Sequence, residues 1–160
     1  MIAIGIDPGS LRTGYGVVKR VGNRLHRVAS GTIRTDAKAP MEQRLLTIHD
    51  NLEQILTANA PDRAAVEDVF FSKNAKSSLK LGQVRGVILL TLAKRELPVT
   101  SYPPALVKRA VVGSGRAAKH QMQRVVQAIL GLKSLPEEDE ADALAIAICL
   151  LNAARISPSG

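Results

Sequence analysis

The segment from Ile2 to Asp7 constrains the fold more than any other part of the chain. It alternates large and small side chains and stops at Pro8-Gly9, a pattern that predicts a β-strand followed by a turn. With a period of two residues, the isoleucines share one face of this strand, and Asp7 lies on the other. Two further strands are predicted directly after it, at residues 13–19 and 25–34, so the chain begins as an antiparallel meander.

The rest of the chain alternates helical and extended patterns. Apolar residues recur every three or four positions from Met41 to Ile55, which predicts an amphipathic helix. Strands are predicted at 63–68 and 99–102, and helices at 75–95, 104–111, 117–130 and 138–154. This order predicts an α/β fold with a mixed five-stranded sheet flanked by helices, although it does not give the order of the strands. The length of 160 residues fits one domain, expected over residues 1–155, with a disordered tail at 156–160.

The positive charge is concentrated in one stretch of the sequence. Residues 69–135 hold 12 basic residues and a single acid, Glu96, whereas the whole chain has a net charge of +8. A polyanion would neutralise such a block, and nucleic acid is the expected partner. The alternative is an ordinary solvated basic face.

Other features exclude several classes of protein. The longest apolar run, residues 143–151, is about half the length of a membrane span. The single cysteine, Cys149, allows neither an internal disulfide nor a cysteine-based metal site. No basic segment precedes the first apolar stretch, so a secretory signal is not expected. We therefore expect a soluble cytoplasmic protein without membrane contacts.

Four carboxylates stand where a strand ends or where a helix turns inward. Asp7 ends the first strand, and Glu67 ends the strand at 63–68, with Asp68 pointing the other way. Asp139 and Asp142 are three residues apart and share one face of a predicted helix. Carboxylates gathered in this way repel one another unless a cation binds them. Two Mg²⁺ or Mn²⁺ ions about 4 Å apart are the usual means of phosphodiester displacement at such a site.

Each acid also has a simpler interpretation. An Asp before Pro-Gly is often a turn residue, and Glu67 could be an ordinary rim charge. The acidic run 137–140 could stabilise a helix N-terminus through the helix dipole, an explanation that fits Asp142 least. Spacing alone therefore suggests a metal-dependent nuclease without establishing one.

Seven motifs together resemble the RuvC-type Holliday junction resolvases, from Met1 to about Asn152. The motifs are Ile4-Gly5-Ile6-Asp7-Pro8-Gly9, Thr13-Gly14-Tyr15-Gly16, Val66-Glu67, Phe70-Phe71, Asn74-Ala75, Leu81-Gly82-Gln83-Val84-Arg85-Gly86 and Asp139-Glu140-Ala141-Asp142-Ala143-Leu144-Ala145. The resemblance implies an RNase H-like fold and a homodimer. It also implies Mg²⁺-dependent, paired nicking of four-way junction DNA in recombination and repair, with the RuvA–RuvB branch-migration complex as a partner.

The resemblance also implies roles for individual residues. The family's four catalytic, metal-binding carboxylates fall on Asp7, Glu67, Asp139 and Asp142, which are expected to hold two Mg²⁺ ions, or Mn²⁺ in their place. The DNA-binding residues implied or expected nearby are Phe70, Lys73, Asn74, Lys76, Lys108, Arg109 and Lys119.

The residue types in the loop after Glu67 suit DNA binding, independently of the resemblance. It places half of the chain's four aromatic residues in a polar, basic segment beside a proposed catalytic acid. Aromatic side chains stack on exposed bases for about 1–3 kcal/mol each. We expect Phe70 to stack in this way and Phe71 to seal the core beneath the loop.

Gly82 and Gly86 stand four residues apart in a predicted helix. Each costs roughly 1 kcal/mol in helix propensity, so a close neighbour should need the space. That neighbour could be a second copy of the chain or the protomer's own sheet, and the resemblance favours a dimer interface.

Three other functions compete with a junction nuclease. The run from Gly5 to Ser10, followed by Thr13-Gly14, also resembles the phosphate loop of actin-like ATPases and sugar kinases, but these need two lobes and a far longer chain. A non-catalytic DNA-binding module would explain the basic block but not the four acids. An RNase H or a general nuclease would share the fold, and only its substrates would distinguish it.

Overall fold

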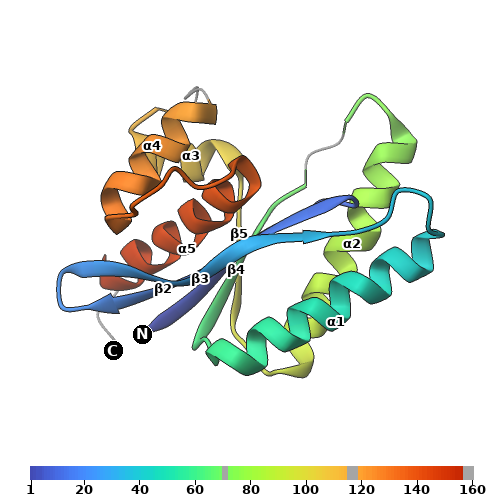
Figure 1. Cartoon of the computed structure of the whole chain (residues 1–160), viewed down its shortest axis with the longest axis horizontal. Coiled ribbons are helices and arrows are strands. Elements are labelled where there is room, and N and C mark those ends of the chain that lie inside the picture. Colours follow the sequence, from blue (N-terminus) through green and yellow to red (C-terminus); the bar gives the residue numbers. More distant parts are fainter. Residues whose placement is uncertain (70–71, 115–118, 157–160) are drawn as a thin grey trace.

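A mixed five-stranded sheet with the strand order β3-β2-β1-β4-β5 crosses the molecule (Figure 1). The structure is a computed structural model and describes residues 1–69, 72–114 and 119–156. The strands are β1 (Ile2–Asp7), β2 (Arg12–Val21), β3 (Arg24–Arg34), β4 (Arg63–Glu67) and β5 (Val99–Tyr102). The first three form the predicted antiparallel meander, whereas β4 lies parallel to β1 and β5 parallel to β4. The predicted mixed α/β fold is confirmed, and the strand order adds that β1 lies in the centre.

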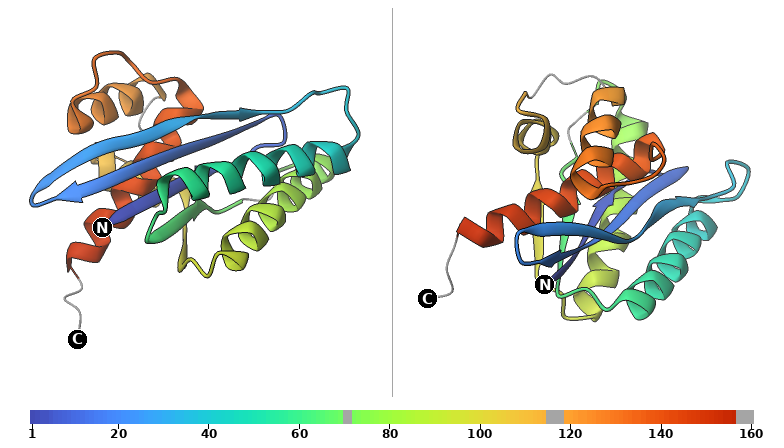
Figure 2. Two further views of the ribbon diagram at one scale, coloured as in Figure 1. Left: turned by 60° about the horizontal axis from the view of Figure 1, so that its bottom comes forward. Right: turned by 60° about the vertical axis from the view of Figure 1, so that its left-hand side comes forward.

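Helices cover both faces of this sheet (Figure 2). They are α1 (Met41–Asn59), α2 (Ala75–Lys94), α3 (Pro104–Val112), α4 (Lys119–Leu130) and α5 (Glu138–Ile156). Helices α1 and α2 pack on one face, and α3, α4 and α5 on the other. None of these described helices is long and apolar enough to cross a membrane.

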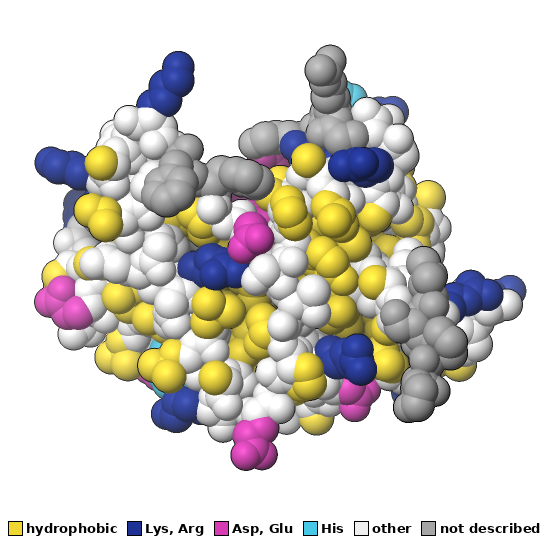
Figure 3. Space-filling model, turned by 180° about the vertical axis from the view of Figure 1, so that it is seen from behind, with side chains coloured by type: hydrophobic (Ala, Val, Ile, Leu, Met, Phe, Trp, Pro, Cys, Tyr) yellow, Lys and Arg dark blue, Asp and Glu magenta, His cyan; other side chains and the backbone are white. Residues whose placement is uncertain are grey.

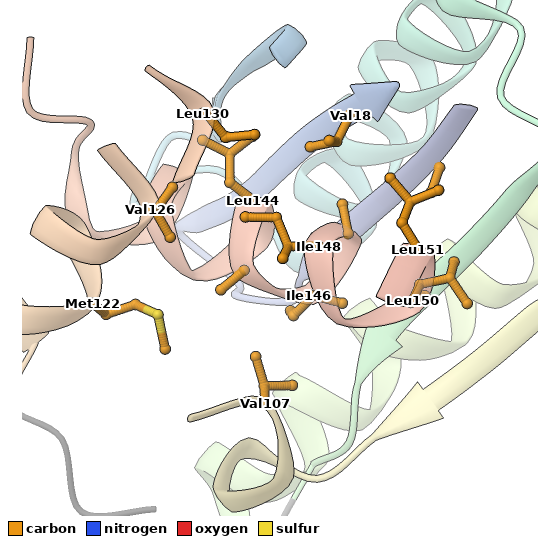
Figure 4. Close-up of a cluster of buried hydrophobic side chains, with 14 residues drawn as sticks. Val18, Val107, Met122, Val126, Leu130, Leu144, Ile146, Ile148, Leu150 and Leu151 are labelled. Atoms are coloured by element: carbon orange, nitrogen blue, oxygen red, sulfur yellow. The ribbon is translucent and has the colours of Figure 1, made fainter. Parts of the chain in front are cut away.

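The two faces of β1 differ in side-chain size, as its alternation predicted. Ile4 and Ile6 are fully buried against α1 and α2. Ala3 faces the second core, in which Leu144 and Ile148 of α5 meet apolar side chains of α3 and α4 (Figure 4). Because the residues on this side are small, α5 can lie close to the sheet.

Three glycines of β1 and β2 set the depth at which α5 packs. A Cβ atom on Gly5 would overlap the backbone of Ala143, and one on Gly14 would overlap the carbonyl oxygen of Asp139. A Cβ atom on Gly16 would come within 2.7 Å of the Leu144 amide nitrogen. Close helix–sheet contact therefore requires glycine at these positions. It places the first turn of α5 over the end of β1.

The predicted boundaries differ from the observed ones by a few residues, mostly at element ends. Strand β4 ends at Glu67, although the Asp68 amide still donates to the Tyr102 carbonyl at 2.9 Å. Helix α5 continues to Ile156, where the tail was predicted to begin, and residues 157–160 lie outside the described part of the chain.

Candidate active site

The pairing of β1 with β4 places Asp7 beside Glu67. The two strands are parallel with Ile6 opposite Val66, so the next residue of each strand emerges at the same edge of the sheet. The two side chains are hydrogen-bonded, and the carboxyl group of Asp7 donates to the carboxylate of Glu67. Two acids far apart in the sequence thus form one hydrogen-bonded pair.

Helix α5 brings the two remaining predicted acids to this pair. Asp7 lies opposite Gly14 in the β1–β2 register, and the missing side chain of Gly14 admits the backbone of Asp139. The negative charge of Asp139 raises the pKa of Asp7, and that of Asp142 raises the pKa of Glu67. The four acids predicted from the sequence therefore lie in one cluster.

Burial and mutual repulsion shift the pKa values of three of these acids. Burial, followed by the charge of Glu67 and the hydrogen bond to it, raises the pKa of Asp7 from 3.8 to about 9. Burial and then the charge of Asp7 raise the pKa of Asp142 to about 7. The pKa of Glu67 is also raised by burial, although the hydrogen bond from Asp7 opposes the shift. The cluster thus carries more carboxylates than it can ionise without a countercharge.

Glu138, whose position in the sequence predicts only a role at the helix N-terminus, belongs to the same cluster. Its charge raises the pKa of both Asp7 and Asp142. A helical spacing of four residues puts Glu138 on the same face as Asp142, and this signal in the sequence was overlooked.

The donor set fits a divalent cation of the Mg²⁺ or Mn²⁺ type. These ions prefer carboxylate oxygens, and a bound cation would relieve the repulsion that raises the pKa values of Asp7 and Asp142. In the described conformation, no three acidic, histidine or cysteine side chains among the described residues form a ready coordination shell. Instead, the Asp7 proton joins two of the acids.

Lys108 of α3 lies beside the acids as a positive charge. It is half-buried, and its charge opposes part of the rise that burial causes in the pKa of both Glu67 and Asp142. The adjacent Arg109 is exposed. Lys119 begins α4, but its side chain lies outside the described part of the structure. In the space-filling view, the molecule is notched between two lobes, and acidic side chains show at the floor of the notch (Figure 3).

The loop that follows Glu67 is fixed at its far end by the start of α2. The side-chain oxygen of Asn74 accepts from the amides of Lys76 and Ser77 at 3.0 and 3.3 Å, so this predicted DNA-binding residue also caps the helix. Lys73 and Lys76 are exposed. Phe70 and Phe71, for which DNA stacking and core packing were expected, lie outside the described residues.

Gly82 and Gly86 are exposed on α2, and among the described residues no atom beyond their own helical turn lies within 4 Å of a Cβ atom added to either. Packing on the protomer's own sheet, one of the two explanations left open, is therefore wrong. The exposed leucines Leu79 and Leu90 share their stripe of the helix at spacings of three and four residues.

Comparisons with known proteins agree on one family. The family model described as Crossover junction endodeoxyribonuclease RuvC matches residues 3–150. Proteins of that name from Sorangium cellulosum and Syntrophotalea carbinolica are each 49% identical, over 96% and 93% of this chain and over 86% and 92% of their own lengths. A solved structure titled T. thermophilus RuvC in complex with Holliday junction substrate superimposes with a TM-score of 0.91 at 35% identity, covering 98% of this chain and 96% of that one. The yeast mitochondrial Holliday junction resolvase, with a TM-score of 0.66 at 15% identity, shares the fold.

Proposed function

The chain belongs to the RuvC family of crossover junction endodeoxyribonucleases, and on this premise we propose that it resolves four-way DNA junctions by paired nicks at the acid cluster. The catalytic carboxylates of this proposal are Asp7, Glu67, Asp139 and Asp142. The observation that carries it is the convergence of these acids at the ends of β1 and β4 and the start of α5. A DNA-binding module without catalysis would have no use for buried carboxylates that raise one another's pKa.

We propose Mg²⁺ as the metal, with two ions per site and Mn²⁺ as a substitute. Asp7, Glu67, Asp139 and Asp142 would hold the ions. Divalent ions bound there would supply an activated water and a countercharge for the scissile phosphate. A proton on Asp7 reduces the repulsion between Asp7 and Glu67, and a bound divalent cation would have the same effect.

The residues around the acids would bind and orient the DNA. Lys108 is near enough to shift the pKa of two of the carboxylates, so its ammonium group is placed to contact a phosphate bound beside them. The remaining contacts proposed are with phosphates, except that Phe70 would stack on a base at the crossover. They come from Lys73, Asn74, Lys76, Arg109 and Lys119.

We also propose that the active form is a homodimer that pairs through α2. The support is the exposed stripe of α2. In the described part of the chain, Cβ atoms added to Gly82 and Gly86 would contact no other segment, and the leucines on either side, Leu79 and Leu90, are 69% and 61% exposed. A twofold dimer would present two acid clusters to a junction with approximate twofold symmetry, which suits two symmetric nicks. The RuvA–RuvB complex is proposed as a further partner from the family resemblance alone.

Cleavage of a synthetic mobile four-way junction tests the function. The parent protein should nick two opposed strands in Mg²⁺ and none in EDTA, and it should leave linear duplex and RNA–DNA hybrid intact. Asp7→Asn should reduce the rate at least about 10³-fold, because it removes charge from the metal-binding cluster, while junction binding in EDTA persists.

Asp50→Asn is the matched control for this substitution. Asp50 is exposed on α1, on the other side of the sheet, and its loss should leave the rate unchanged. Nicking by Asp7→Asn at the parent rate would refute the proposed site. Junction binding by the parent without cleavage in either Mg²⁺ or Mn²⁺ would favour the non-catalytic alternative.

A further inference from the structure

Arg85 of α2 joins that helix to the ends of two strands of the sheet. Its Nε donates to the backbone carbonyl of Glu67 at 3.3 Å. Its Nη2 donates to Asp68 Oδ1 at 3.0 Å and to Ser101 Oγ at 2.6 Å. The side chain is only 20% exposed, so these bonds form in a partly desolvated place. One guanidinium group therefore spans the last residue of β4, the residue after it, and β5.

These bonds close the base of the loop that follows Glu67. The chain leaves β4 at Glu67, passes through the loop, enters α2 at Ala75 and returns to Glu67 through Arg85. The far end of the loop is held by the Asn74 cap and by a bond from the Ser72 amide to Ser78 Oγ at 3.0 Å. Both ends of the loop are thus anchored to the same helix.

Arg85 acts on the backbone of Glu67 and not on its charge. The cation that lowers the pKa of the Glu67 carboxyl is Lys108, whereas the guanidinium of Arg85 is paired with Asp68. The carboxylate of Glu67 is turned towards Asp7. The position of that carboxylate depends on where the last residue of β4 is held, and Arg85 holds its carbonyl.

We propose that Arg85 is a positioning residue of the nuclease. It holds the peptide of Glu67 and the base of the loop in place, and through it helix α2 determines the position of the acid cluster. This role rests on the proposed function of the cluster. It matters because a displacement of about 1 Å in a reacting group can cost about 10²-fold in rate. It also means that α2, the helix with the exposed Leu79–Leu90 stripe, is rigidly connected to a catalytic strand.

Arg85→Lys is the first test, because lysine keeps the charge but lacks the fork that serves three acceptors. The single-turnover nicking rate in Mg²⁺ should fall about 10- to 100-fold, whereas junction affinity in EDTA and the dimer constant should change less than about 2-fold. Asp68→Asn keeps an acceptor for Nη2 and should lower the rate less than Arg85→Lys does.

Arg95→Lys is the matched control. Arg95, at the other end of α2, also joins two elements, because it bonds Glu53 and Thr57 of α1, but it lies away from the acid cluster. Its replacement should lower the midpoint of thermal unfolding without changing the nicking rate. A parental rate for Arg85→Lys, or equal rate losses for the two variants, would refute the positioning role.

If the variants differ in stability, chemical rescue of the nicking rate by an added cation can still test the role of Arg85. Methylguanidinium at millimolar concentration should raise the nicking rate of Arg85→Ala, whereas ethylammonium at the same ionic strength should not. Rescue by neither cation, in a variant whose thermal unfolding shows that it is folded, would count against the role. Failure of the parent to nick the junction would refute the proposed function itself, which is a different result from failure of these variants.

Discussion

The carboxyl group of Asp7 donates a hydrogen bond to the carboxylate of Glu67, across the ends of two neighbouring parallel strands. The proton is retained because burial and the charge of Glu67 raise the pKa of Asp7 to about 9. Burial and the charge of Glu67 therefore favour a proton on Asp7 at neutral pH. A divalent cation would replace that proton and carry out the same neutralisation with more charge.

Folding stability should depend on pH through this proton. The pKa of Asp7 is higher in the folded protein, at about 9, than its ordinary value of 3.8, so the folded state binds the proton more tightly. The resulting stabilisation is complete below pH 3.8 and is lost as the pH rises towards about 9. In EDTA, Asp7→Asn should therefore unfold at a higher temperature than the parent at pH 8, by at least about 2 °C, and at nearly the same temperature at pH 4.

Thermal unfolding monitored by circular dichroism between pH 4 and 9 measures this difference. For Asp142→Asn the gain over the parent should be nearly complete by about pH 7, because the pKa of Asp142 is raised only that far. Adding Mg²⁺ at pH 8 should stabilise the parent more than Asp7→Asn. A difference between Asp7→Asn and the parent that does not vary with pH would contradict the shared proton.

Lys108→Ala should reduce nicking more than binding. The lysine lies close enough to the acids to lower the pKa of Glu67 and Asp142, so its charge acts where negative charge develops on the phosphate. We expect a single-turnover rate about 10- to 100-fold lower, with junction affinity reduced less than about 3-fold.

Arg24→Ala is the control for Lys108. Arg24 is an exposed cation at the first residue of β3, at the other end of the sheet from Asp7. Its loss should change neither the rate nor the salt dependence of binding. Equal losses of rate and affinity in Lys108→Ala, with a salt slope reduced by about 0.9, would make the lysine a simple phosphate anchor.

Gly86→Leu should convert the protein to a monomer without unfolding it. The site is exposed and has no atom within 4 Å of an added Cβ, so the monomer can accept the side chain. Leucine should also favour the isolated helix by up to about 1 kcal/mol. Sedimentation velocity should show a lighter species and unfolding a higher midpoint, and the two nicks in one junction should become uncoupled. If the parent is a dimer and the folded variant sediments as the parent does, the interface lies elsewhere on the protein.

Gly14→Ala should lower the nicking rate, although Gly14 is not one of the four acids, because it displaces helix α5. The new Cβ would overlap the carbonyl oxygen of Asp139, so α5 must move away from the sheet and take Asp139 and Asp142 with it. We expect a loss of about 1–3 kcal/mol in unfolding free energy and a nicking rate at least about 10-fold lower. Gly82→Ala makes the same chemical change where no atom of the described residues lies within 4 Å of the added Cβ, so it should not lower the unfolding free energy. If Gly14→Ala is as stable and as active as the parent, the close packing of α5 is not required.

The sequence predicted the meander, the helices and the four acids because each leaves a local signal. Alternation in Ile2–Asp7 marks both the strand and its two faces, and the position of Asp7 at the strand end follows from the turn at Pro8-Gly9. The strand order could not be predicted, since nothing in the local pattern of β4 specifies that it pairs with β1.

The features that were missed depend on contacts between distant segments. Glu138 has a helical spacing that matches Asp142, but its influence on Asp7 exists only once α5 lies on the sheet. The three bonds of Arg85 join α2 to β4 and β5, so no periodicity reveals them. Asn74 was assigned to DNA from its loop, whereas its side-chain oxygen also caps α2.

The packing of α5 on Gly5, Gly14 and Gly16 also has a consequence for the enzyme while it is being synthesised, because the acid cluster is completed only after α5 has been made. Asp7 and Glu67 leave the ribosome early, but the cluster lacks two of its carboxylates until the residues of α5 follow and pack on Gly5, Gly14 and Gly16. A nascent chain that has already formed the sheet is thus a cationic protein without a nuclease site. Asp139 and Asp142 lie on α5, so the four-carboxylate cluster cannot be complete in such a chain before α5 packs on the sheet.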